Sequence, residues 1–188
     1  MSYSVIEEEC KDIDWFCIID KYPIHVASAG GILPEIIKKE KKINQKNRKI
    51  IKNASEYCDY KLNPKLKNII SKYINPKDES HILAVLEALN LKSNKPIDTY
   101  IEKVYAHSFI EFAKKGFYSF DKSNINDPND GKYHLVASPS KLITNEIISE
   151  LPNIQTDDFN LQNDSFDLIA FINRNTNDRC RILKNDNL

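Results

Sequence analysis

The sequence contains few arginines and no excess of charge of either sign. Its 188 residues include only four arginines, and the formal net charge is zero. A balanced chain creates no global field that would draw it toward nucleic acid or an anionic membrane. Lysine contacts phosphate as a point charge and not as a bidentate fork, so the scarcity of arginine also disfavours a phosphate-recognition site.

Long apolar runs are also absent. No segment approaches the roughly 18–20 apolar residues that a membrane-spanning helix requires, and residues 1–9 have neither the basic start nor the apolar stretch of a signal peptide. We therefore expect a cytoplasmic protein with no membrane partner. The cysteines lie far apart at Cys10, Cys17, Cys58 and Cys180. Without a C-x-x-C pair or an export signal, reduced thiols are favoured over disulfides.

Motifs that carry known chemistry are mostly missing. The chain has no P-loop, dinucleotide-binding glycine motif, nucleophile elbow or metalloprotease helix motif. Its four histidines never fall four residues apart on one predicted helix, so neither a metal nor a cofactor is expected. Residues 138–141 read Ser-Pro-Ser-Lys and match the S-x-x-K nucleophile motif, but its S-D-N and K-T-G companions are lacking. Pro139 also favours a turn over the helical spacing that the lysine of this motif needs.

The chain does contain one pattern twice. Residues 15–21 are an apolar run ending in Asp-Lys, and His-Val-Ala-Ser follows at 25–28. Residues 117–122 and 134–138 repeat this order, with His-Leu-Val-Ala-Ser in the second part. Such runs predict two similar hairpins, at about 14–28 and 117–138, with Tyr22-Pro23 in the turn of the first. The repetition is either a chance recurrence of a common strand-and-turn pattern or a sign of equivalent places in one sheet.

The segment between the hairpins has helical periodicity. Apolar spacing, caps and breakers predict helices at 35–53, 63–75, 78–89 and 98–116. Gly116 is the expected stop of the last helix. After the second hairpin, an ill-defined stretch at 143–151 precedes a C-terminal strand at 166–173, and 179–183 is a further candidate strand. This order predicts a single α+β domain over residues 1–188, with a mostly antiparallel sheet and helices to one side.

The predicted helix at 35–53 is strongly basic. Between residues 38 and 52 only Glu40 opposes its positive side chains, which are Lys38, Lys39, Lys41, Lys42, Lys46, Arg48, Lys49 and Lys52. Its apolar positions form a stripe that repeats every seven residues, and they are Ile36, Ile37, Ile43, Ile50 and Ile51. The compensating acidic group is Asp157, Asp158, Asp164 and Asp167. The lysine face is interpreted as a solvated surface or as a contact for an acidic protein. A nucleic-acid site is disfavoured because no aromatic platform for bases accompanies it.

Four residues of the hairpins have both a structural and a functional interpretation. His25 and His134 occupy matching places, and carboxylates at Asp20 and Asp121 are near enough in sequence to form acid–base pairs with them. The alternative is that both are polar strand residues facing solvent. Cys17 and Cys58 are the thiols that could act as nucleophiles, but Cys17 lies inside an apolar strand, where a buried thiol behaves as a small hydrophobic residue. Trp15 is expected in the core because both faces of its strand are apolar, with the sheet rim as the alternative.

Parts of both hairpins resemble one group of small bacterial proteins. Asp14-Trp15-Phe16, His25, residues 28–31 and Leu33-Pro34 resemble its opening, an Asp-Trp-Phe hairpin followed by a small-residue turn and Leu-Pro. Residues 116–121 and 136–139 resemble its second hairpin. Such cytosolic proteins look similar to the immunity proteins of bacterial toxin systems, and the resemblance implies action by binding. Lys21-Tyr22-Pro23 replaces the glycines that are typical of the first turn.

The leading hypothesis is therefore a non-enzymatic cytosolic protein that binds a protein partner, as an immunity-type inhibitor of a bacterial toxin domain would. The expected contact combines the basic helix with the rim of the first hairpin, and its residues are Lys38, Lys42, Lys46, Lys49, Asp14, Asp20 and His25. Such charge separation steers association more than it sets affinity. The alternative is a small hydrolase that uses His25 and His134 near a shared cleft, which requires both imidazoles to converge on one point.

Overall fold

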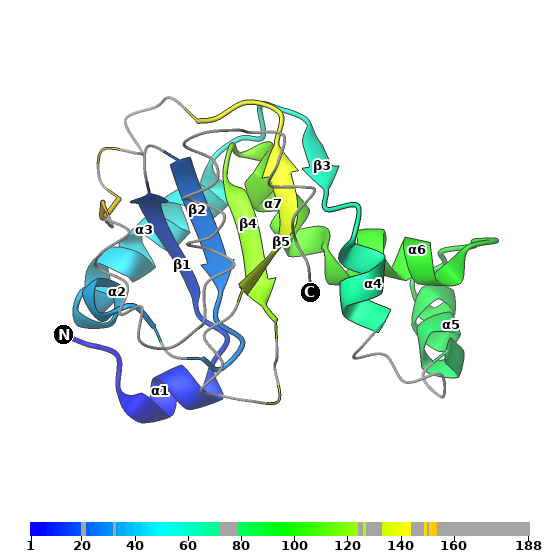
Figure 1. Cartoon of the computed structure of the whole chain (residues 1–188), viewed down its shortest axis with the longest axis horizontal. Helices are drawn as coiled ribbons and strands as arrows, with labels where there is room; N and C mark the ends of the chain where they lie inside the picture. Colours follow the sequence, from blue (N-terminus) through cyan, green and yellow to red (C-terminus); the bar gives the residue numbers. More distant parts are fainter. Residues whose placement is uncertain are drawn as a thin grey trace.

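One sheet of five strands organises the described part of the chain. The computed structural model describes residues 1–19, 22–31, 33–71, 79–123, 126, 133–143, 149 and 151–153. The strands are β1 (Asp14–Ile19), β2 (Tyr22–Ala27), β3 (Tyr60–Leu62), β4 (Tyr118–Lys122) and β5 (Tyr133–Pro139). Their order in the sheet is β1-β2-β4-β5-β3 (Figure 1). Only the β2–β4 pair is parallel among them, so the predicted α+β fold with a mostly antiparallel sheet is confirmed.

Both predicted hairpins are present and are neighbours in the sheet. β1 pairs with β2 and β4 pairs with β5, each antiparallel. The two hairpins meet along β2 and β4, which run parallel, with His25 opposite Ser119. A copy of the first hairpin simply displaced along the sheet would place β4 antiparallel to β2. The strands of the second hairpin therefore run in the opposite directions to those of the first, and a translation along the sheet does not relate the two hairpins.

The turn of the first hairpin differs from the prediction. Tyr22 and Pro23 belong to β2 and not to the turn, and Pro23 lies opposite Ile18. The amide of Ile18 points away from β2 and donates to the carbonyl of Pro152. Pro23 is thus in a pair that exchanges no backbone hydrogen bonds, so its missing N–H removes no hydrogen bond to β1.

Seven α-helices and one π-helical turn are described besides the strands. They are α1 (Val5–Cys10), α2 (Glu35–Lys39), α3 (Lys41–Asn53), α4 (Leu66–Ser71), α5 (Glu79–Ala88), α6 (Pro96–Tyr100), the turn η2 (Ile101–Tyr105) and α7 (His107–Lys114). The predicted helix at 98–116 corresponds to α6, η2 and α7. It ends at Gly116, which has φ +87°, so the expected glycine stop is confirmed.

The basic helix is two helices and not one. Glu40, with φ −103° and ψ 41°, leaves the helical region between α2 and α3. The interruption changes the face that is buried: Asn44, Asn47 and Ile51 face inward from α3. Ile36, Ile43 and Ile50, three members of the apolar stripe that repeats every seven residues, are exposed. Asn44 takes an inward position because its amide donates to the backbone oxygen of Asp14 and to the Tyr3 hydroxyl.

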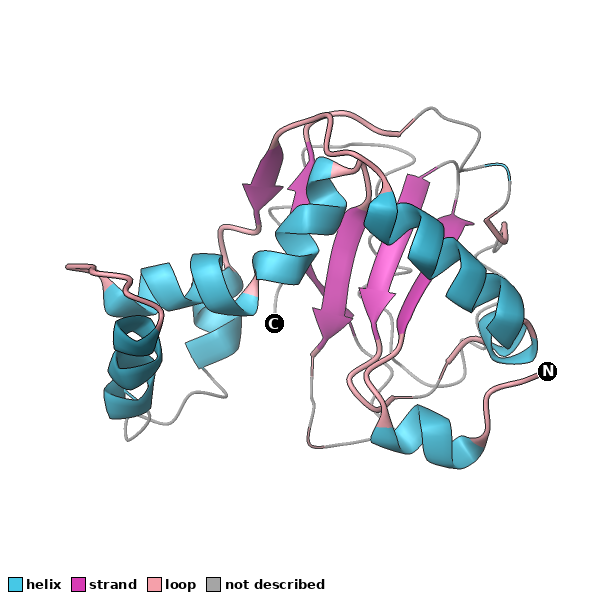
Figure 2. Cartoon of the chain, turned by 180° about the vertical axis from the view of Figure 1, so that it is seen from behind, coloured by secondary structure: helices cyan, strands magenta, loops and turns pink. Residues whose placement is uncertain are grey.

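Helices α3 and α7 cover one face of the sheet (Figure 2). On that face Phe16 and Ile18 of β1 pack against Ile51 of α3 and Phe112 of α7. The other face holds alternate residues of the same strands, and Trp15 belongs to it with no exposed surface. The predictions that Trp15 lies in the core and that β1 is covered on both sides are confirmed.

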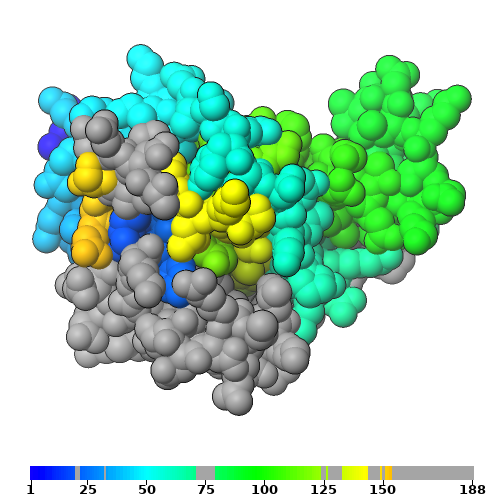
Figure 3. All heavy atoms as spheres, turned by 90° about the horizontal axis from the view of Figure 1, so that it is seen from above, coloured from blue at the N-terminus to red at the C-terminus, as the bar shows by residue number. Residues whose placement is uncertain are grey.

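Helices α5 and α6 project from the sheet as an arm, with α4 at its base (Figures 1 and 3). Leu66 and Ile70 of α4 and Ile101 of η2 pack against Ala27 and Val136 of the sheet and fix that base. None of the described helices is long and apolar enough to cross a membrane. The predicted strands at 166–173 and 179–183, the acidic group at 157–167 and most of 143–151 lie outside the described residues.

Candidate functional site

His25 is the centre of a buried hydrogen-bonded chain on the helix-covered face. Its Nε2 lies 3.1 Å from Asp14 Oδ1, and its Nδ1 lies 3.2 Å from Ser119 Oγ. Arg48 Nε of α3 donates to the other carboxylate oxygen, Asp14 Oδ2, at 2.7 Å. The pattern is satisfied when Nε2–H donates to Asp14 and Nδ1 shares a hydrogen bond with the Ser119 hydroxyl. The Phe112 ring stacks on this imidazole with a centroid distance of 4.0 Å.

This hydrogen-bonded chain has the order Asp–His–Ser of a catalytic triad, but a substrate could not reach its serine. His25 is 1% exposed and Ser119 is 0% exposed. A nucleophile has to touch its substrate, and Ser119 belongs to β4, which is covered by α7. Burial raises the pKa of Asp14, but the hydrogen bonds from His25 and Arg48 outweigh burial and hold this pKa at about 2. These hydrogen bonds therefore link β1, β2, β4 and α3 to one another.

A second chain of the same kind surrounds His134. The hydroxyl of Tyr105, at the end of η2, donates to Asp121 Oδ2 at 2.6 Å and lies 3.1 Å from His134 Nε2. Ser123 Oγ lies 3.4 Å from His134 Nδ1, and the amide of Lys122 donates to Asp121 Oδ1. One direction of donation satisfies every group: Ser123 to His134, His134 to Tyr105, and Tyr105 to Asp121. Asp121 and His134 also face one another across β4 and β5.

Burial shifts both titratable ends of the second chain toward their neutral forms. It raises the pKa of Asp121 to about 6, although the hydrogen bonds from Tyr105 and the Lys122 amide partly oppose it. It lowers the pKa of His134 to about 4. Both shifts follow from the cost of holding a charge where water is excluded.

The two histidines do not converge on a common point. His25 lies on β2 and His134 on β5, with β4 between them. Two strand spacings separate them by roughly 10 Å, and each ring is hydrogen-bonded within its own chain. His25 pairs with Asp14, and Asp20, its expected partner, lies outside the described residues. His134 does share a chain with Asp121, as expected, but through Tyr105. The shared cleft that a hydrolase would need is not formed by these two imidazoles.

The exposed side of α3 carries the lysines that the sequence singled out. Lys42, Lys46 and Lys49 are all exposed. At 100° per residue these three lysines lie opposite the buried Asn44, Asn47 and Ile51, within an arc of roughly 60°. We call Lys42, Lys46 and Lys49 the basic face of α3. Lys38 does not belong to it, because its ammonium on α2 lies 2.5 Å from the buried carboxylate of Glu8 in α1.

Two isoleucines border the basic face. Ile43 is 45% exposed and Ile50 is 37% exposed. They are seven residues apart, so they point in nearly the same direction, and Lys46 lies between them. We call Ile43 and Ile50 the isoleucine ridge. Of the three hairpin residues that we expected beside it, His25 is buried, Asp14 is paired with Arg48 and His25, and Asp20 lies outside the described residues.

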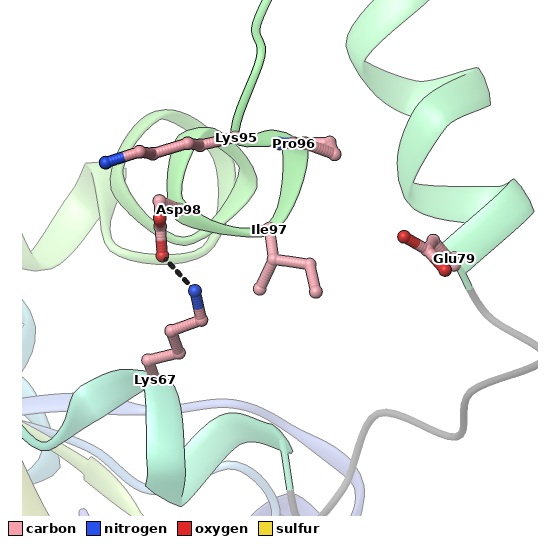
Figure 4. A pocket seen from close by; sticks show the side chains of 6 residues that line it. All are labelled: Lys67, Glu79, Lys95, Pro96, Ile97 and Asp98. Carbon is pink, nitrogen blue, oxygen red and sulfur yellow. Dashed lines mark ion pairs between the residues drawn. The ribbon is translucent and has the colours of Figure 1, made fainter.

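A hollow of about 360 Å³ lies in the arm (Figure 4). It is lined by Lys67, Glu79, Lys95, Pro96, Ile97 and Asp98. Lys67 and Asp98 pair with each other at 2.7 Å, and Glu79 faces them from α5. Charges of both signs therefore line the hollow, and they favour neither an anionic nor a cationic ligand.

Cysteines and carboxylates elsewhere in the described residues form no reactive group. Cys10, Cys17 and Cys58 are free thiols. Burial raises the pKa of the Cys17 thiol, so this sulfur is an inert part of the core, as predicted. Among the residues that the structure describes, no three His, Cys, Asp or Glu side chains are grouped to hold a metal ion.

Comparisons of the chain with protein-family models, with curated proteins and with solved structures find no match. The function is therefore inferred from the geometry of the chain itself. Four side chains of the two hydrogen-bonded chains were not predicted to belong to them: Arg48, Ser119, Tyr105 and Ser123. A signal for Ser119 existed in the hairpin echo, because Ser119 and Asp121 alternate on one strand and must share a face. Arg48 and Tyr105 join the sheet only through tertiary contacts.

Proposed function

We propose that this protein is a cytosolic binding protein that engages an acidic protein partner through the basic face of α3, as an immunity-type inhibitor of a bacterial toxin would. The observation that carries the proposal is the position of Lys42, Lys46 and Lys49. They share one exposed side of a helix whose opposite side is docked on the sheet. A rigid helix presents its charges in a fixed array, and a partner with matching carboxylates is recognised by that array.

The balance of charge within α3 supports this role. Lys42 and Lys46 are four residues apart, and Lys46 and Lys49 are three apart, so like charges face each other along the helix. Each such pair costs the helix a few tenths of a kcal/mol. A partner that presents carboxylates to this side of α3 would add attraction of the opposite sign.

The buried state of the acid–base groups favours binding over catalysis. The imidazoles of His25 and His134 have their hydrogen bonds satisfied within the protein and have little exposed surface. General acid–base catalysis requires that such a group reach the proton it transfers. The two hydrogen-bonded chains, around His25 and around His134, instead stabilise the sheet beneath α7 and η2.

Charge reversal on α3 tests the proposal. The variant Lys42→Glu/Lys46→Glu/Lys49→Glu should retain the folded state, since the three side chains are exposed, and should lose at least about tenfold in affinity for the partner. The partner is isolated from native cells on the wild-type chain, identified, and measured in pure form by calorimetry. Affinity should also fall as salt is raised, because exposed charges are screened.

The matched control reverses three lysines elsewhere. Lys61→Glu/Lys92→Glu/Lys95→Glu changes the net charge by the same amount at exposed positions outside α3. It should bind the partner as the wild type does. Equal loss in both variants would mean that net charge alone matters. Undiminished binding by the α3 variant would contradict the proposal.

A further inference from the structure

We infer that the partner presents an acidic amphipathic helix, whose apolar residues two turns apart seat on the isoleucine ridge. The inference rests on the proposed function and adds the chemistry of the partner's contact. Its first observation is that Ile43 and Ile50 are exposed. The ridge lies next to the basic face of α3 on the same element. The exposed side of α3 is thus both apolar and positive.

The spacing of the ridge selects a helix as the complementary shape. Seven residues of α-helix rise about 10.5 Å and complete nearly two turns, so Ile43 and Ile50 form two apolar points about two turns apart. A second helix laid alongside repeats its own side chains with the same period. Apolar residues seven apart on that helix would meet both isoleucines at once. A strand, with its period of two residues, has no such match.

The charges indicate where the acidic residues of the partner lie. The basic face is on only one flank of the ridge, because the other flank is the buried side with Asn44 and Asn47. The carboxylates of the partner would therefore be on one side of its apolar stripe, in the manner of the charged positions beside a coiled-coil seam. This one-sided arrangement also sets the orientation of the incoming helix. Helix-in-groove recognition elsewhere uses the same combination of apolar anchors and flanking charge.

The two parts of the surface have separable effects on binding. Exposed lysines act at a distance and chiefly raise the association rate, and salt weakens that effect. Apolar anchors act at contact and chiefly slow dissociation. The ridge therefore accounts for discrimination between an amphipathic helix and any other acidic segment of equal charge.

Two synthetic peptides test the inference on the full chain. One is an acidic peptide of about three heptads with leucine at every seventh position and glutamates to one side. The other has the same composition in scrambled order. Titration into isotope-labelled protein, followed by amide chemical shifts, should show the ordered peptide shifting residues 41–53 and binding at least about tenfold more tightly than the scrambled one.

Removing the ridge should abolish that preference. Ile43→Gln/Ile50→Gln keeps helix-forming side chains and should lower affinity for the ordered peptide to that for the scrambled one. Leu83→Gln/Leu89→Gln, at positions 50% and 52% exposed on or just after α5, should change nothing. Equal affinity for both peptides, or shifts away from α3, would overturn the helix inference. The charge-reversal variant separates this failure from that of the proposed function, since it tests the lysines against the natural partner alone.

Discussion

At the scale of single residues, two histidines are used as structural links. Each ring has a serine hydroxyl beside its Nδ1. Nε2 of His25 lies beside the Asp14 carboxylate, and Nε2 of His134 lies beside the Tyr105 hydroxyl, which donates to Asp121. Buried polar groups are tolerated only when they are hydrogen-bonded, and both rings meet this condition across strands or between strand and helix. Each link therefore favours one register of the sheet, because a slip by one residue would turn the imidazole to the opposite face.

The second chain predicts two opposing effects of pH on stability. The folded-state pKa of Asp121 is about 6, above the ordinary value of 3.8, so its contribution is full at low pH and is lost as the pH rises to about 6. The pKa of His134 is about 4, below the ordinary 6.5, so its contribution is full above 6.5 and is lost as the pH falls to about 4. In the wild type the two nearly cancel between pH 4 and 6.

Single substitutions should separate the two effects. Asp121→Asn leaves the histidine, and the free energy of unfolding should fall by about 3 kcal/mol, relative to wild type, as the pH drops from 6.5 to 4. His134→Gln leaves the carboxyl, and the free energy should rise by a similar amount over about the same range. Urea unfolding at several pH values measures both. The double variant should restore a dependence of the unfolding free energy on pH that is parallel to that of the wild type. Parallel curves for the wild type and all three variants would show that the two groups do not titrate as described.

At the scale of elements, the end of α7 depends on one glycine. Gly116 has φ +87°, and a Cβ placed there would lie 2.3 Å from the Tyr57 hydroxyl and 2.5 Å from the Ile143 amide. Gly116→Ala therefore combines an unfavourable backbone conformation with a clash against the backbone of Ile143. We expect a loss of at least about 2 kcal/mol in the free energy of unfolding, measured with urea.

Asn90 supplies the comparison for Gly116. It too has a positive φ, +55°, at the end of α5, but its side chain is exposed. Asn90→Gly should change the free energy of unfolding by less than about 1 kcal/mol. If Gly116→Ala were as mild as Asn90→Gly, the close packing described at the end of α7 would be incorrect.

The sequence identified most elements because local patterns specify them. The hairpins, the helices after Asn63 and the stop at Gly116 follow from alternation, periodicity and breakers. The short helix α1 was missed although Ser4 and Glu7 form the capping box that announces it. The interruption at Glu40 has no such local signal. The interruption precedes the helix α3, whose Asn44 donates to the Tyr3 hydroxyl and to the backbone oxygen of Asp14. These are tertiary contacts, which local sequence does not specify.

At the scale of the whole molecule, the sequence could not show how the hairpins join. Each hairpin is a local unit, but the parallel contact of β2 and β4 links segments that the helices separate along the chain. Pairing at that distance is decided by which faces must be buried and not by neighbouring residues. The same holds for the strand β3, whose three residues gain their conformation from β5.

The candidate site was predictable in part for the same reason. Lys42, Lys46 and Lys49 were identified because helical spacing alone places charged residues on a surface. Lys38 and His25 were expected there too, but Lys38 is paired with Glu8, and His25 is buried beside Asp14. The exposure of Ile43 and Ile50 depends on the interruption at Glu40. Composition shows which residues carry charge, and packing decides which of them a partner can reach.

Hydrogen exchange on the purified complex tests the central claim most directly. Amide exchange of the chain is compared with and without its isolated partner, and protection is mapped along the sequence. New protection should be concentrated in residues 41–53, and residues 79–100 of the arm should exchange as before. Protection confined to the arm or to the strands, with α3 unchanged, would contradict it.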